Sequence, residues 1–151
     1  MSRFENTFPT RLPVWWARFG EPELVHETPG VSGRKVMVRI LKGSERGKGL
    51  ARVFHVMEEL MFRITKGPRV LRRPLDSMNS LLWELCDGSR RFEEICDLMD
   101  SAFEESIAPV QERTQAAIIQ LEALGFLAVL PQLFDRGWPT GPGVSPRGLL
   151  L

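Results

Sequence analysis

Few residues of this sequence have the types and spacing that catalysis or metal binding requires. The two histidines are His26 and His55, and "HVMEE" at 55–59 lacks the second histidine that completes a zinc-binding helix. Two histidines so placed also offer no Ser-His-Asp arrangement. The glycine-rich "GSERGKG" at 43–49 lacks the Gly-Lys-Ser/Thr ending with which a P-loop holds phosphate and Mg²⁺. We therefore expect a binding protein that is not an enzyme and that carries no metal ion or cofactor.

The two cysteines, Cys86 and Cys96, both fall at apolar positions of predicted helices. A reducing cytosol keeps such residues as thiols, and we expect both to be buried. The sequence has no run of about 18 uncharged apolar residues, and its first residues lack the apolar stretch of a secretory signal. These features predict a soluble, cytoplasmic protein without a membrane partner.

The length of 151 residues and the apolar content of 43% allow one compact domain, which we place at residues 34–130. Residues 1–33 are rich in proline and glycine and show no sustained period. We interpret them as an N-terminal arm that docks through Trp15 and Trp16 on the core or on a second subunit. Residues 131–151 form a Pro/Gly-rich tail that we expect to be flexible.

A net charge of +1 conceals a strong asymmetry along the chain. Residues 34–73 hold twelve Lys or Arg against three Glu, a net charge of +9. Residues 74–125 hold eleven acidic residues against three Arg, a net charge of −8. Either the two halves attract each other in the folded chain, or the basic half presents a face to an acidic partner.

Three segments before residue 75 have residue patterns that predict secondary structure. "RKVMVRIL" at 34–41 alternates apolar and polar residues, which predicts a half-buried strand. "RVLRR" at 69–73 predicts a second short strand, closed by Pro74 because proline cannot donate to a sheet. Between them, the apolar residues of 50–64 have the spacing of one helix face, although two strands, "RVFHV" and "LMFRI", fit the same residues.

The rest of the chain predicts three helices and a strand. Asp76 is a good N-cap for the first helix, and Gly88 is suited to the left-handed conformation after its end. The second helix covers about 91–103, where apolar residues recur with a helical period. The third begins near Pro109, which suits a first helical position, and ends at Gly125, before a short strand in "FLAVL".

This order of helices followed by a strand is the winged-helix pattern typical of DNA-binding proteins. A recognition helix needs about one positive charge for each phosphate contact. The second helix instead has acidic residues on its solvent side, namely Glu93, Glu94, Asp97, Asp100, Glu104 and Glu105. These acids disfavour major-groove binding, so we do not expect a nucleic-acid partner for this helix. The alternative hypothesis is a nucleic-acid-binding regulator that uses the basic segment 34–73.

"LDSMNSLLWELCDGSRRFEEI" at 75–95, together with "IIQLEALGFL" at 118–127, resembles the pyrroloquinoline-quinone biosynthesis protein D (PqqD-like) family, whose members are also called RiPP recognition elements. The resemblance covers about residues 68–130. The matching positions are Leu75, Asp76, Trp83, Glu84, Leu85, Asp87, Gly88, Glu94, Ile95, Leu121, Leu124, Gly125 and Leu127. The sequence departs at Arg91, where the family often has Thr. It also departs in the long arm and the 50–64 segment, which stand where the family has a compact three-stranded sheet.

The resemblance implies an α+β, winged-helix-like fold with three strands before three helices, and a peptide-binding module without catalytic activity. In this family the leader of a ribosomally made precursor peptide adds as a further strand beside the last helix. The module then presents the peptide to a modifying enzyme, such as a radical-SAM enzyme. Mapped onto this chain, the edge is 69–73 and the wall is the helix from 110 to 124. The residues expected to bind the peptide are Arg69, Val70, Leu71, Arg72, Arg73, Gln115, Ile118, Ile119 and Glu122.

Two further interpretations stay open. Arg72 and Arg73 either attract acidic side chains of the leader peptide or only protect a solvated edge from aggregation. A third hypothesis for the whole chain is a homo-oligomeric scaffold, in which "PVWW" of one chain fills the groove of another and dimerisation proceeds through the N-terminal arm.

Overall fold

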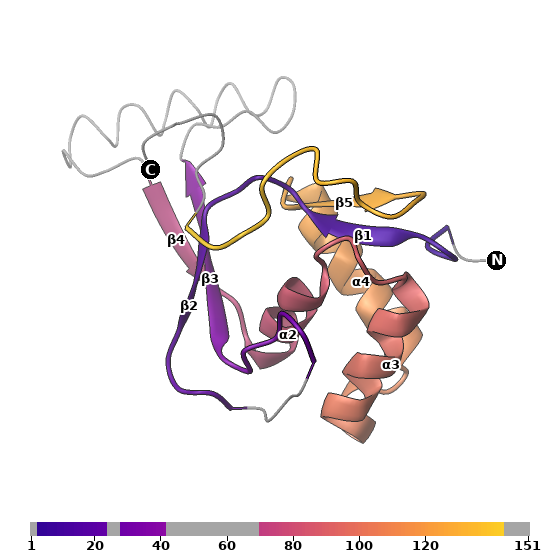
Figure 1. Cartoon of the computed structure of the whole chain (residues 1–151). Coiled ribbons are helices and arrows are strands. Elements are labelled where there is room, and N and C mark those ends of the chain that lie inside the picture. Colours follow the sequence, from indigo (N-terminus) through magenta and orange to yellow (C-terminus); the bar gives the residue numbers. More distant parts are fainter. Residues whose placement is uncertain (1–2, 24–27, 42–69, 144–151) are drawn as a thin grey trace, which may run out of the picture.

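The computed structural model of this chain describes residues 3–23, 28–41 and 70–143. In this part the chain forms three α-helices, one short 3₁₀ helix and two antiparallel sheets, which confirms the predicted α+β class. Figure 1 shows the helices on one side of the three-stranded sheet, with the two-stranded sheet beside the last helix. The predicted element at 50–64 lies outside the described residues, as do Arg69 and both histidines.

The three-stranded sheet has the order β2 (Trp16–Phe19), β3 (Lys35–Leu41) and β4 (Val70–Pro74). Strands β3 and β4 confirm the two strands predicted from the sequence. Val36 and Val38 are fully buried, so one face of β3 packs on the helices. The backbone N–H of Val36 donates 2.9 Å to the Oγ of Ser80, which fixes β3 against the first helix.

The N-terminal arm contributes strands that the sequence analysis did not predict. Strand β1 (Phe8–Arg11) pairs antiparallel with β5 (Leu127–Leu130), and β2 pairs with β3. Each of these two strands has only four residues, too few for a reliable period. The expected docking on the core is confirmed for Trp16, which is 1% exposed and makes an edge-to-face contact with Trp83 at 6.1 Å.

The helices follow the predicted boundaries closely. Helix α2 (Ser77–Leu85) begins after Asp76, whose Oδ1 accepts a 2.7 Å hydrogen bond from the backbone N–H of Asn79. Gly88 has the positive φ of 86° that was predicted for it. Helices α3 (Phe92–Phe103), η1 (Glu104–Ile107) and α4 (Val110–Ala123) follow. Pro109 is the N-cap of α4, one position before the predicted one.

The departure from the family pattern at Arg91 is compensated locally. Arg91 has no hydroxyl, but its backbone N–H donates 3.3 Å to Oε1 of Glu94 in the first turn of α3. The carboxylate of Glu93, in the same turn, accepts a 2.8 Å hydrogen bond from the backbone N–H of Asn6. Acidic side chains in a first turn interact favourably with the helix dipole. Helix α3 therefore starts at the predicted place without the usual side-chain cap.

Residues 131–143, which we call the C-terminal strap, cross back over the arm (Figure 1). The backbone N–H of Phe134 donates 3.1 Å to Gly88, and the indole Nε1 of Trp138 donates 2.8 Å to the carbonyl of Arg11. The N–H of Gly143 donates 2.7 Å to the carbonyl of Trp16. The expectation of a flexible tail from residue 131 therefore does not hold as far as residue 143, because long-range hydrogen bonds replace local periodicity there.

Candidate functional site

Strand β4 is an edge strand within the described part of the chain. It pairs antiparallel with β3 on one side, and no described strand pairs with its other side. An edge of this kind presents backbone N–H and C=O groups in a row, to which another extended segment can pair. Pro74 at the end of β4 lacks an N–H, so the pairing surface ends there.

The register of β3 and β4 pairs each described edge residue with a residue of β3. Arg73 is opposite the buried Val38, so it lies on the helix side of the sheet, and it is exposed at the edge. Arg72 is opposite Arg39 in the register. The guanidinium of Arg39 stacks 3.7 Å from the centre of the Trp15 ring. Arg73 therefore gives the helix side of this edge an exposed positive charge.

The other two described edge residues continue the same register. Leu71 is opposite Ile40, and Val70 is opposite Leu41.

The residues predicted on α4 do not form one continuous wall. Ile118 is fully buried and belongs to the core, so it supports the helix from inside, whereas Ile119 is 44% exposed. Gln115 is half-buried. The carboxylate of Glu122 forms an ion pair with Arg3, which precedes β1, so this turn of α4 faces the N-terminal segment.

A hollow of about 140 Å³ lies where the chain leaves β4 and enters α2. Asp76, Met78 and Asn79 form one wall, and Arg113, Thr114 and Ala117 of α4 form the other; Leu82, Met99 and Ile107 complete its lining. The first half of α4 therefore lines this hollow together with the start of α2, which follows β4 in the chain. This hollow was not predicted from the sequence, because Met78 and Ala117 occupy positions at which side chains of a fully packed core are equally expected. Arg113, on the α4 wall, donates 2.7 Å from its Nη1 to the carbonyl of Ser106.

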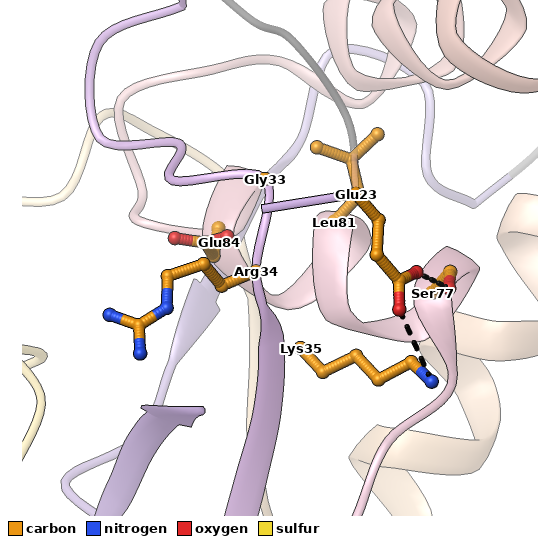
Figure 2. A pocket seen from close by; sticks show the side chains of 7 residues that line it. All are labelled: Glu23, Gly33, Arg34, Lys35, Ser77, Leu81 and Glu84. Carbon is orange, nitrogen blue, oxygen red and sulfur yellow. Dashed lines mark hydrogen bonds and ion pairs between the residues drawn. The ribbon is translucent and has the colours of Figure 1, made fainter. Parts of the chain in front are cut away.

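A second hollow, whose lining residues are shown in Figure 2, has no space for a water molecule. The carboxylate of Glu23 spans it, accepting a 2.5 Å hydrogen bond from the Oγ of Ser77 and lying 3.3 Å from the Nζ of Lys35. These two contacts, that to Ser77 first, lower the pKa of Glu23. Glu84 of α2 also lines this hollow, and its side chain is buried. These contacts brace the segment after β2 against α2 and leave no site for a ligand.

Both cysteines belong to the core of the described part of the chain. Both thiols are buried, as predicted, and burial raises the pKa of Cys86 to about 12 and that of Cys96 to about 11. No group of three or more His, Cys, Asp or Glu in this part of the chain is arranged to hold a metal ion. None of the described helices is long and apolar enough to cross a membrane.

The predicted acidic face of α3 is present in the structure. Glu94, Asp97 and Asp100 are exposed, and so are Glu104 and Glu105 of the adjoining η1 helix. Glu93 is half-buried because it caps the backbone of Asn6. Side chains of one sign on this face repel phosphate.

Comparison with known proteins gives one positive result. Residues 74–127 match the family model of coenzyme PQQ synthesis protein D (PqqD). The match extends from the last residue of β4 through α2, α3 and α4 to the first residue of β5, and it confirms the PqqD-like resemblance seen in the sequence. No curated protein and no solved structure matches the chain.

Proposed function

We propose, on the premise that residues 74–127 are PqqD-like, that this chain binds an extended segment of a precursor peptide and presents it to a modifying enzyme. The segment adds to β4 as a further strand. The observation that carries the proposal is the edge position of β4. Along the edge that faces away from β3, no described strand pairs with it, and the chain passes from its end into the lining of an open hollow. The hollow begins at Asp76, two residues after β4, so a side chain at the end of the added segment is the one proposed to enter it.

The hollow supports a choice of side chain. Its lining combines Met78, Leu82 and Ala117 with the polar groups of Asp76 and Arg113 at its sides. A single apolar side chain of the added strand would be removed from water there, which favours binding by roughly 1.5–3 kcal/mol for a residue such as Leu. The backbone pairing supplies affinity, and the hollow supplies selectivity.

Charge supports an acidic segment as the ligand. Arg73 is exposed on the helix side of β4, and Arg72 precedes it in the same strand. Arg69 precedes them in the sequence. Exposed ion pairs contribute only about 0–1 kcal/mol each, so these residues serve mainly to attract and orient the segment.

The family match supports the choice of partner. The matching family model describes a coenzyme synthesis protein, which supports a role beside a biosynthetic enzyme and not catalysis by this chain. The partner that we propose is a peptide-modifying enzyme such as a radical-SAM enzyme, with a ribosomally made leader peptide as the bound segment.

The homo-oligomeric alternative has less support. Trp16 of the "PVWW" segment is buried in the core of its own chain, where its Nε1 donates 3.0 Å to the carbonyl of Thr140. Trp15 is half-buried and stacked with Arg39. These side chains are therefore already engaged within one chain and are not free to fill the groove of a second one.

The decisive experiment uses a short open reading frame encoded beside this chain as the source of the peptide. A fluorescent peptide of about 20 residues from its N-terminal half is titrated with the full chain and followed by anisotropy. We expect saturable binding that weakens about tenfold or more when alternate backbone amides of the peptide are N-methylated, since these amides can no longer pair with β4.

Two variants localise the interaction. Ala117→Trp fills the hollow and Arg73→Glu reverses the charge at the edge, and both should weaken binding, whereas Asp97→Asn on the acidic face of α3 should not. Binding that tolerates N-methylation and both site variants would rule out strand addition at β4. Circular dichroism of each variant establishes that it is folded.

A further inference from the structure

A large cavity among the described residues lies away from β4, under the C-terminal strap. It has a volume of about 770 Å³. Arg11 at the end of β1, with Asp87 and Ser89 after α2, forms its base, and Phe134 and Trp138 of the strap form an aromatic wall with ring centres 4.7 Å apart. Pockets of about 300–1,000 Å³ are typical of small-molecule sites in proteins.

The cavity contains a buried positive charge. Arg11 is only 7% exposed, and its guanidinium donates to the backbone carbonyls of Trp83, Glu84 and Thr140 at 2.7, 3.1 and 3.0 Å. Within the described part of the chain, no carboxylate forms an ion pair with it. A buried charge that is bonded only to neutral groups is costly unless a counter-charge lies close by.

Asp87, the acidic residue at the base of the cavity, offsets the charge of Arg11 only in part, because its carboxylate oxygens are bonded to other residues. The Oδ1 of Asp87 accepts hydrogen bonds from the backbone N–H and Oγ of Ser89 at 2.9 and 2.6 Å. Its Oδ2 lies 3.4 Å from the Nη1 of Arg90, to which it is ion-paired. Arg136 of the strap adds an exposed positive charge at the cavity wall. The lining therefore has an excess of positive charge.

We propose that this cavity binds a small organic anion, in which a carboxylate or phosphate group faces Arg11 and a flat apolar body lies against Phe134 and Trp138. The Nε and Nη1 of Arg11 are bonded to the carbonyls, so Nη2 is the guanidinium nitrogen for which the described residues supply no acceptor, and it can donate a charge-assisted hydrogen bond to an oxyanion. The aromatic wall explains the preference for a flat body, because aromatic rings favour stacked or edge-to-face contacts. This site is separate from the peptide-binding edge and goes beyond the proposed function.

The test uses three probes of similar shape on the full-length chain: benzoate, phenyl phosphate and the neutral benzamide. Titrations are followed by ¹H–¹⁵N spectra of the four tryptophan indoles. The Trp138 signal is identified by its loss in Trp138→Leu. We expect a saturable shift of this signal with at least one of the two anions, and at least tenfold weaker binding of benzamide, as for a lost hydrogen bond to a charged group.

Two substitutions of basic residues test the role assigned to charge. Arg136→Gln should weaken binding of the anion about two- to fivefold, the range of an exposed ion pair. Arg11→Lys keeps the charge but loses the Nη2 donor held in place by the carbonyl bonds of Nε and Nη1, and should weaken binding of the anion more. Because Arg11 also stabilises the fold, the thermal transition of the Arg11→Lys variant is measured as well. If that variant is unfolded, Arg136→Gln alone tests whether positive charge contributes to binding of the anion.

A matched control separates this site from the proposed peptide site. Arg73→Gln removes a positive charge at β4, outside the cavity, and should leave binding of the anion unchanged. The proposal is overturned if neither anion shifts the Trp138 signal saturably, if benzamide binds as well as the anions, or if Arg73→Gln weakens binding as much as Arg136→Gln.

Discussion

The Nε of Arg18 donates a 2.7 Å hydrogen bond to Oε2 of Glu84, whose side chain is completely buried. The same carboxylate accepts hydrogen bonds from the backbone N–H and the Oγ of Ser32 at 3.0 and 3.1 Å. Arg18 belongs to β2 and Glu84 to α2. This pair therefore fastens the N-terminal arm to the segment that matches the family model.

Replacing Glu84 with alanine should lower the free energy of unfolding by about 3–5 kcal/mol, the cost of removing one partner of a buried ion pair. The substitution leaves the donors of Arg18 and Ser32 without an acceptor. Guanidinium denaturation measures the effect, and Asp97→Asn on the exposed face of α3 serves as control, with an expected change within about 0.5 kcal/mol. A loss for Glu84→Ala no larger than that of the control would mean that the pair does not hold the arm.

Gly88→Ala should be strongly destabilising for two reasons. Gly88 has φ = 86°, where a Cβ costs about 1–2 kcal/mol. A Cβ at this position would also lie 2.3 Å from the Cβ of Phe134 and 2.8 Å from the Oγ1 of Thr10. Crowding of this kind adds roughly 1–3 kcal/mol. We expect a large fall in the thermal midpoint, with faster hydrogen exchange at the Phe134 amide, because the strap is displaced.

Gly20→Ala is the matched control for this substitution. Gly20 has a similar φ of 76°, but a Cβ there meets no atom within 4 Å. It should show only the conformational cost of about 1–2 kcal/mol. The difference between the two variants measures the contact with the strap, and equal losses would contradict the close packing of Phe134 on Gly88.

The two thiols predict a fall in stability at alkaline pH. Burial raises the pKa of Cys86 to about 12 and that of Cys96 to about 11, from 9.0 in both cases. Above pH 9 the unfolded chain loses thiol protons that the folded chain retains. The free energy of unfolding should therefore decrease as pH rises from about 9 toward 11, by up to about 1.4 kcal/mol per pH unit for each thiol.

Denaturation at pH 8, 9 and 10 in the unmodified chain and in Cys86→Ala measures this contribution. The variant should show a shallower dependence on pH, because one titrating group is absent. Both thiols of the native chain should also react slowly with a thiol reagent at pH 8. Fast labelling of the folded chain at Cys86 would show that this residue is not enclosed.

The acidic face of α3 predicts that duplex DNA does not bind through this helix. Asp97 and Asp100 are exposed there and repel phosphate. Anisotropy of a labelled duplex should show no binding at physiological salt. An affinity that falls steeply with added salt, and that is abolished by Arg73→Glu at the basic edge, would instead favour the regulator hypothesis.

Interactions between residues close in the sequence allowed most of the helix boundaries to be predicted. The Asp76 cap, the positive φ at Gly88 and the apolar period of α3 involve residues only a few positions apart, so their effect is readable along the chain. The same holds for β3, whose alternation extends over seven residues. Both thiols were placed in the core for the same reason, because their positions share the period of their helices.

Long-range pairing decided the rest. Nothing near Phe8–Arg11 in the sequence indicates that these residues pair with Leu127–Leu130, because the hydrogen-bonding partner lies more than a hundred residues away. The partners of Arg11 under the strap and the hollow beside Ala117 likewise depend on segments that meet only in the folded chain. Capping and periodicity are properties of neighbouring residues. Cavities, sheet edges and buried ion pairs arise where distant segments pack, and only the tertiary structure brings those segments together.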